Sequence, residues 1–188
     1  MNRISRGLGA GVIAALVAST PLMASEPGDD GLHKAGGMRE TFKDLREDLA
    51  EANAEGKRFA IIFEQRGCIY CRQMHEQVFP DPDIDSFIHE NYFIIQMNLF
   101  GDVEVTDFDG ETLPEKEMAR KWGLLFTPTL MFFPQDVPED VTAPRAAVAQ
   151  MPGAFGKFTT LAMLRWVKEQ GYDGDEPFQR YLNRLMTE

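Results

Sequence analysis

The spacing of apolar residues changes several times along the chain after residue 38. Between Met38 and Gly56, apolar residues recur at helical spacing among charged ones, which predicts an amphipathic helix ended by the glycine. Three apolar runs, at residues 58–65, 92–98 and 127–133, are too short for long helices and predict strands, the first two buried. The apolar positions of the predicted first helix are Phe42, Leu45, Leu49 and Ala52.

The segments between and after these strands are mostly helical in pattern. Residues 99–117 are the exception, because they are acidic and broken by Gly101, Gly110 and Pro114, which predicts a long exposed excursion. Helices and strands in this mixed order predict a single α/β domain with a central mixed sheet flanked by helices. Further helical pieces are expected at 68–79, 81–92, 118–122, 159–170 and 177–186, and a further strand at 146–151.

Residues 1–25 have the pattern of a secretory signal peptide. Two arginines precede a short apolar run, no acid is present, and small residues follow a proline. The run is too short and too glycine-rich to span a bilayer comfortably, so we expect cleavage near Ala24 or Ser25 and a periplasmic location. Residues 26–37 are polar and glycine-rich and are expected to form a flexible linker, which leaves 38–188 as the folded domain.

Composition and charge narrow the classes of function. The chain has 188 residues, of which 44% are hydrophobic, enough for one domain with its own core. Its formal net charge of −11 becomes more negative once the leader arginines are removed, so its surface repels nucleic acid and anionic lipid. Nucleic acid is therefore not an expected partner.

The only two cysteines, Cys68 and Cys71, lie in the sequence RGCIYC directly after the strand predicted at 58–65. A CxxC pair between a strand and a helix is a redox signature, and an exported pair of thiols is readily oxidised. At the first turn of a helix, backbone N–H groups and the helix dipole favour thiolate, so we expect the pKa of Cys68 to fall from about 8.5 to roughly 3.5 to 7.5. Cys68 is then the expected nucleophile, and Cys71, deeper and less acidic, the resolving thiol.

Residues next to the cysteines are expected to adjust this chemistry. Ile69 and Tyr70 alter the start of the helix and the access of solvent, and Arg72 stabilises nearby negative charge. None of them sets the direction of electron transfer. Beyond a redox-active Cys68–Cys71 disulfide, no metal or organic cofactor is expected.

Other uses of the two cysteines stay open, although each is less favoured. A structural disulfide that closes so short a loop gains little unfolded-state entropy. A zinc site with His75 needs a further ligand, and only His33 or His89 is available. The alternative class of function is a non-catalytic thiol-based metal-binding or chaperone module. Weaker metal candidates are copper at Met74 and Met97 and calcium at Asp107, Asp109 and Glu111.

Together, RGCIYC after a buried strand and FTPTLMFF some way downstream resemble the thioredoxin superfamily over about Met38 to Gln170. The resemblance implies a thioredoxin-like fold with an acidic insertion before a strand that opens with a cis proline. Pro128 is then the cis proline, and Thr127 presents backbone groups that bind an extended segment of a protein disulfide substrate.

Within the superfamily, the leader, GCIYCRQM, VFPDPDI and the acidic insertion resemble SoxW-type periplasmic thioredoxins of sulfur-oxidising bacteria. This resemblance implies a thiol:disulfide oxidoreductase that acts as a reductase. Its electron donor is then a membrane thiol transporter, and it keeps a periplasmic component of sulfur oxidation reduced.

Four positions depart from ordinary thioredoxin. Gly67 stands where a tryptophan precedes the first cysteine, Ile69 and Tyr70 replace glycine and proline, and Ile62 replaces a buried aspartate. Since that acid normally helps to take the proton from the second cysteine, another group is needed here. Glu64 is a candidate because it points to the same side of its strand as Ile62, and the alternative is a surface glutamate near the end of the strand.

Overall fold

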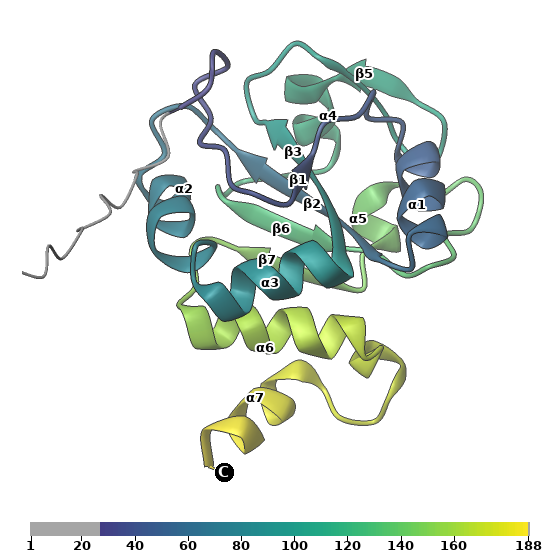
Figure 1. Ribbon diagram of the computed structural model, residues 1–188. Coiled ribbons are helices and arrows are strands. Elements are labelled where there is room, and N and C mark those ends of the chain that lie inside the picture. Colours follow the sequence, from purple (N-terminus) through teal and green to yellow (C-terminus); the bar gives the residue numbers. More distant parts are fainter. Residues whose placement is uncertain (1–26, 188) are drawn as a thin grey trace, which may run out of the picture.

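The computed structural model describes residues 27–187, which fold around one five-stranded mixed sheet (Figure 1). The strand order is β1-β3-β2-β6-β7, with β1, β3 and β2 parallel and β6 and β7 antiparallel to their neighbours. The strands are β1 (Met38–Arg39), β2 (Arg58–Glu64), β3 (Tyr92–Asn98), β6 (Thr129–Phe132) and β7 (Ala149–Pro152). The predicted signal peptide, residues 1–25, lies outside the described residues.

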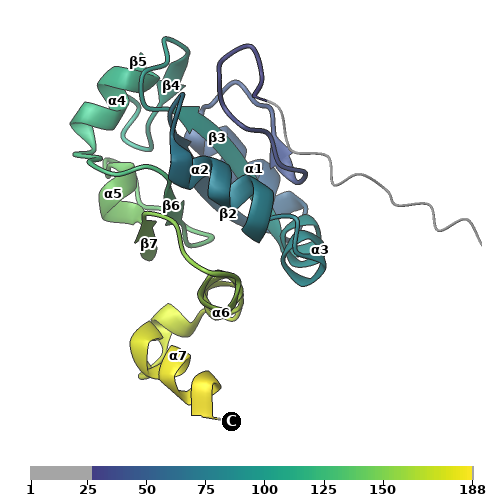
Figure 2. The same cartoon turned by 90° about the vertical axis from the view of Figure 1, so that its left-hand side faces the viewer.

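Alternate residues of β2 face two separate hydrophobic clusters, one on each side of the sheet. Ala60 and Ile62 pack in the cluster that contains α3 and α6, whereas Phe59, Ile61 and Phe63 pack in the cluster that contains α1 and α4. Figures 1 and 2 show these helices on opposite faces of the sheet. The helices are α1 (Leu45–Ala54), α3 (Pro82–Asn91), α4 (Glu115–Lys121), α5 (Ala143–Ala146) and α6 (Lys157–Lys168).

The predicted α/β class and the mixed sheet flanked by helices are therefore confirmed. The strands expected at 58–65 and 92–98 match β2 and β3 to within one residue. The helix expected from Pro82 onwards also forms, and Asp81 caps it by accepting a hydrogen bond from the N–H of Asp83. After α6, the chain passes a 3₁₀ turn, η2 (Gly171–Asp173), and ends in α7 (Phe178–Thr187), which packs on α6.

The first helix begins later than its apolar pattern predicted. Residues Met38 and Arg39 form strand β1 against β3, and Phe42 is 96% exposed instead of lying on a buried helix face. Lys43 has a φ of 59°, which a right-handed helix does not allow. The helix starts only at Leu45, where the Asp44 carboxylate accepts hydrogen bonds from two backbone N–H groups.

The segment expected to be a flexible linker packs on the domain in its described part, residues 27–37. Leu32 is buried, and Pro27 and His33 form an isolated β-bridge. The side-chain amide of Gln96 on β3 donates a hydrogen bond to the His33 carbonyl. The segment therefore packs over β3.

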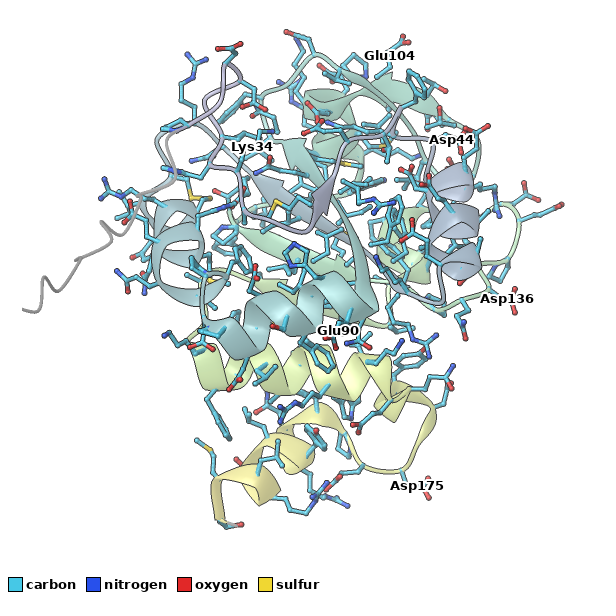
Figure 3. All side chains as sticks on the ribbon, viewed as in Figure 1. Lys34, Asp44, Glu90, Glu104, Asp136 and Asp175 are labelled. Atoms are coloured by element: carbon cyan, nitrogen blue, oxygen red, sulfur yellow. A yellow bond between two sulfur atoms is a disulfide. The ribbon has the colours of Figure 1, made fainter. Side chains whose placement is uncertain are left out.

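The acidic excursion at 99–117 is only partly exposed. It contains a small antiparallel hairpin of β4 (Glu104–Thr106) and β5 (Thr112–Pro114), which precedes α4. Val105, Asp107 and Phe108 are buried, so the turn of the hairpin is anchored to the domain. Within the excursion, Glu104 reaches solvent and points outward, as do Asp136 and Asp175 elsewhere on the surface (Figure 3).

Among the described helices, none is long and apolar enough to cross a membrane.

Candidate active site

The two cysteines form a disulfide at the start of the helix that follows β2. Cys68 is the N-cap residue of α2 (Ile69–Gln73), and its sulfur accepts a hydrogen bond from the backbone N–H of Cys71 at 3.0 Å. The turn before it requires a φ of 72° at Gly67, a conformation that favours glycine over the tryptophan of ordinary thioredoxin. Cys68 is 8% exposed and Cys71 2%, so an approaching group reaches Cys68 first.

Thr127 faces the Cys68 sulfur from the loop directly before β6. Its hydroxyl lies 3.5 Å from the sulfur, to which it can donate a hydrogen bond, and its carbonyl oxygen lies 3.6 Å away. The Thr127–Pro128 peptide bond is cis, and Pro128 is buried while Thr127 is partly exposed. The sequence pointed to the backbone of Thr127, but not to its hydroxyl.

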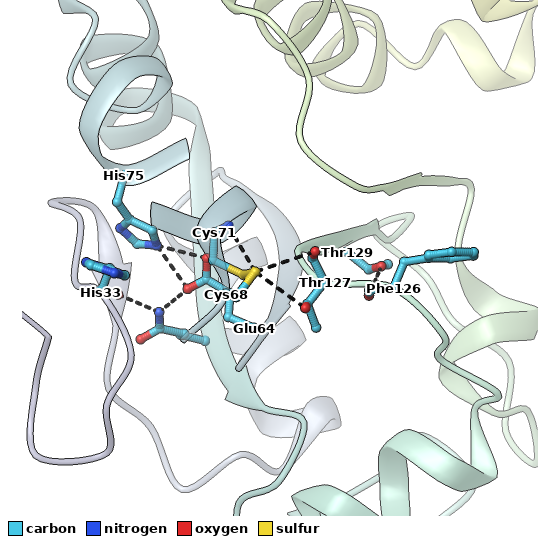
Figure 4. The surroundings of a disulfide bond; sticks show 9 residues. His33, Glu64, Cys68, Cys71, His75, Phe126, Thr127 and Thr129 are labelled. Atoms are coloured by element: carbon cyan, nitrogen blue, oxygen red, sulfur yellow. Dashed lines mark hydrogen bonds and ion pairs between the residues drawn. A yellow bond between two sulfur atoms is a disulfide. The ribbon is translucent and has the colours of Figure 1, made fainter. Parts of the chain in front are cut away.

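Glu64 is buried at the end of β2, so the alternative of a surface glutamate is wrong. The Nε2 atom of His75 lies 3.0 and 2.9 Å from the two carboxylate oxygens of Glu64. The side-chain amide of Gln96 donates a further hydrogen bond to the same carboxylate. Figure 4 shows Glu64 and His75 on one side of the disulfide and Thr127 on the other.

His75, which the sequence suggested only as a weak zinc ligand, is 2% exposed. The reason is local: after α2 the helix widens into a π-helical turn, η1 (Met74–Val78), which directs consecutive side chains inward. Met74 and His75 are both buried, and the His75 ring meets the Phe79 ring edge-on at 5.3 Å. A periodicity of 3.6 residues does not reveal such a turn.

The remaining predicted neighbours of the cysteines lie at the surface. Ile69 and Tyr70 are 62% and 57% exposed, and Arg72 is exposed as well. They line a shallow groove of about 370 Å³ on the outer side of α2. Across the disulfide, Leu125 and Phe126 are also exposed, so apolar side chains lie on both sides of Cys68.

The described residues contain no group of three or more histidine, cysteine and acidic side chains arranged to hold a metal ion. At the site considered for calcium, the Nζ atom of Lys121 lies within 3.0 Å of Asp107, Asp109 and Glu111, so an internal cation occupies the position between these carboxylates. His75 is paired with Glu64 and not with the two sulfurs.

A CxxC disulfide at the start of a helix that directly follows a central strand defines a class of enzyme: a thiol:disulfide oxidoreductase. The family model described as a thioredoxin-like domain matches residues 45–139, and the chain belongs to this family.

Solved structures agree with this assignment at the level of the fold. A thioredoxin-fold protein from Helicobacter pylori is similar with a TM-score of 0.56 and 15% identity, over 87% of this chain and 92% of the other. A thioredoxin from Thermus thermophilus is similar with a TM-score of 0.51 and 24% identity, over 68% and 86% of the two chains. No curated protein matches the sequence.

Proposed function

We propose that the protein is an exported reductase of protein disulfides, with Cys68 as the nucleophile and Cys71 as the resolving thiol. The observation that carries the proposal is the position of Cys68. Its sulfur lies at a helix N-terminus, accepts a backbone hydrogen bond and lies within reach of the Thr127 hydroxyl, and all three features favour a thiolate.

The reaction then has two exchange steps. In the reduced enzyme, the Cys68 thiolate attacks one sulfur of a substrate disulfide, and the other sulfur leaves as a thiolate that takes a proton. Cys71 then attacks Cys68, which breaks the mixed disulfide, forms the Cys68–Cys71 bond and releases the second substrate thiol. Two electrons have passed to the substrate, and a dithiol donor restores the enzyme by the reverse steps.

The substrate segment is proposed to bind along Thr127 and Pro128. The Thr127 carbonyl lies beside the Cys68 sulfur, so a strand that pairs with it brings its own sulfur close to the nucleophile. The exposed side chains of Ile69 and Tyr70 on one side and of Leu125 and Phe126 on the other offer apolar contact to residues that flank the substrate disulfide.

The proposed location is the periplasm, with a membrane thiol transporter as electron donor and a component of sulfur oxidation as substrate. The support for these assignments is the leader pattern of residues 1–25 and the resemblance of GCIYCRQM and VFPDPDI to SoxW-type thioredoxins. The direction of electron flow is tested by equilibrating the protein with reduced and oxidised glutathione. A reduction potential of the Cys68–Cys71 couple close to that of thioredoxin supports a reductase, and a strongly oxidising potential contradicts it.

Reduction of insulin with a dithiol donor tests the exchange reaction. Cys68→Ser is expected to abolish turnover, whereas Cys71→Ser is expected to accumulate a mixed disulfide that mass spectrometry detects. Adding Ser86→Cys to the Cys68→Ser variant restores an exposed thiol on α3 and should stay inactive. A wild-type protein that forms no mixed disulfide, and instead retains metal at its thiols, would be the non-catalytic metal-binding or chaperone module.

A further inference from the structure

Glu64 and His75 lie beside the disulfide (Figure 4), and together with Gln96, which donates a hydrogen bond to Glu64, they form a buried polar cluster. The Glu64 side chain is 1% exposed and that of His75 0%, and buried charged or polar groups of this kind are unfavourable unless their hydrogen bonds are satisfied. Glu64 receives donors from both partners, so its carboxylate is held in one position.

Gln96 is itself oriented by the segment that packs over it. Its amide oxygen accepts a hydrogen bond from the Lys34 ammonium at 2.8 Å, and its amide nitrogen donates to the His33 carbonyl at 2.7 Å. The amide group can therefore present only N–H to Glu64. Residues 27–37 thus close the cluster off on the side away from the cysteines.

His75 faces the carboxylate with Nε2, and since a carboxylate accepts hydrogen bonds, this nitrogen carries a proton. Its other nitrogen, Nδ1, is buried and has no hydrogen-bond partner among the described residues. Because a buried polar atom without a partner is unfavourable, its presence calls for a functional explanation.

The chain brings this cluster close to Cys71 from two directions. Glu64 ends β2 just before the turn that leads to Cys68, and His75 follows Cys71 by about one helical turn. Both side chains lie on the side of the disulfide opposite Thr127 (Figure 4). Cys71 is 2% exposed, so bulk water has little access to its sulfur.

The chemistry of the proposed function requires a proton acceptor at this place. A thiol at Cys71 must lose its proton to attack the mixed disulfide, and Ile62 leaves no acid at the position that serves ordinary thioredoxin. We propose that Glu64 accepts the proton of Cys71 as this sulfur forms the new S–S bond, and that His75 is the positioning residue that holds the carboxylate. On reduction of the disulfide, the proton returns to Cys71.

The test separates the two exchange steps, because this inference rests on the proposed function. A chromogenic aromatic disulfide mixed with the reduced protein releases one coloured thiolate when Cys68 attacks and a second when Cys71 resolves the adduct. In Glu64→Gln, we expect the second step to be about 100-fold slower at pH 7, while the first step is not slowed. The slow step should recover as the pH rises, because hydroxide then removes the proton.

The pH profile distinguishes proton transfer from a merely structural defect, which would slow resolution equally at every pH. Other titratable or charged groups near the cluster are His33 and Lys34 on the covering segment, and Asp30, which pairs with Lys34. His75→Leu is expected to slow resolution about tenfold, and His75→Gln, which keeps an N–H donor, should restore most of the rate. The exposed neighbours on α3 provide matched controls, since Glu90→Gln and His89→Gln should change neither step.

Two results would overturn the proposal. One is equal resolution rates in the wild type and in folded Glu64→Gln, as judged by circular dichroism. If that variant does not fold, ring nitrogen NMR of the wild-type protein decides: a proton on Nε2 of His75 is expected, and a ring protonated on Nδ1 alone contradicts the arrangement. Failure of the proposed function looks different, because then no mixed disulfide forms even in the wild type.

Discussion

Single atoms near Cys68 decide how strongly its thiolate is stabilised. The Thr127 hydroxyl lies 3.5 Å from the sulfur, and a hydrogen bond to a charged group contributes about 1.5 kcal/mol or more. Thr127→Val keeps the shape of the side chain and removes the hydroxyl. We therefore expect mixed-disulfide formation to become about tenfold slower at neutral pH, measured as the first coloured-thiolate step. Thr159→Val on α6 is the control, and an unchanged rate in Thr127→Val would remove the role of the hydroxyl.

Asp48 is a second residue whose charge is decided by its surroundings. It is 4% exposed on α1, and burial raises its pKa to about 7, although Thr41 donates a hydrogen bond to it. The folded protein therefore binds this proton more tightly than the unfolded chain, whose carboxyl has an ordinary pKa of 3.8. The resulting stabilisation is complete below pH 4 and is lost as the pH rises through 7.

Asp48→Asn removes this titration while keeping the size of the side chain. As the pH rises from 4 to 8, the unfolding free energy of the variant should increase relative to that of the wild type by roughly 1 to 3 kcal/mol. The size of the pKa shift sets an upper limit of about 4 kcal/mol for this difference. Urea unfolding at the two pH values measures this difference. Glu90→Gln, at an exposed position of α3, should show no such trend, and a parallel pH dependence of wild type and Asp48→Asn would contradict the prediction.

At the scale of helices and strands, the hydrophobic pattern predicted those elements whose position depends on burial alone. The strands β2 and β3 are continuous apolar runs because both of their faces are covered, and their bounds were predicted to within one residue. The pattern placed Phe42 on a helix face, but the pairing of β1 with β3 and the left-handed conformation of Lys43 exclude a helix there. Long-range pairing of this kind leaves no local signal in the sequence.

The candidate site was predictable in the parts that are local in sequence. Cys68, Cys71 and the strand before them form one contiguous motif, and the cap position of Cys68 follows from it. By contrast, the partners of Glu64 come from a π-helical turn and from the middle of β3. The only signal for them was polar residues within otherwise apolar stretches, such as Gln96 in YFIIQMN.

One cation on α4 contributes to the attachment of the hairpin β4–β5, beside its buried residues Val105 and Phe108. Lys121 on α4 contacts Asp107, Asp109 and Glu111; burial opposes its charge, but hydrogen bonds to these acids hold its pKa above the usual range. Lys121→Met leaves the carboxylates facing one another, and we expect a loss of about 2 kcal/mol in urea unfolding together with faster amide exchange in the hairpin. Lys116→Met breaks only an exposed pair with Asp102 and should cost at most about 0.5 kcal/mol. Equal losses in the two variants would show that the cluster does not anchor the hairpin.

For the whole molecule, the disulfide lies between two sides with different roles. Thr127 and the exposed apolar residues face outward, where a protein substrate can bind, and the Glu64 cluster faces inward beneath the covering segment. This division places substrate contacts and proton transfer on opposite sides of the same sulfur atoms. A substitution on one side of the disulfide therefore makes no direct contact with the residues on the other side.

The covering segment, residues 27–37, allows a test of this arrangement at the scale of the whole chain. A protein that starts at Met38 lacks the buried Leu32 and both groups that orient Gln96. We expect it to lose about 2 to 4 kcal/mol of unfolding free energy, because burial of one leucine already contributes about 2 kcal/mol. Leu32→Ala in the longer chain should reproduce most of this loss but leave the Gln96 hydrogen bonds in place. Chemical denaturation of the two variants and of a chain that starts at Pro27 measures these differences. If the chain that starts at Met38 is as stable as the one that starts at Pro27, the segment is a linker after all, because its contacts then contribute nothing to the fold.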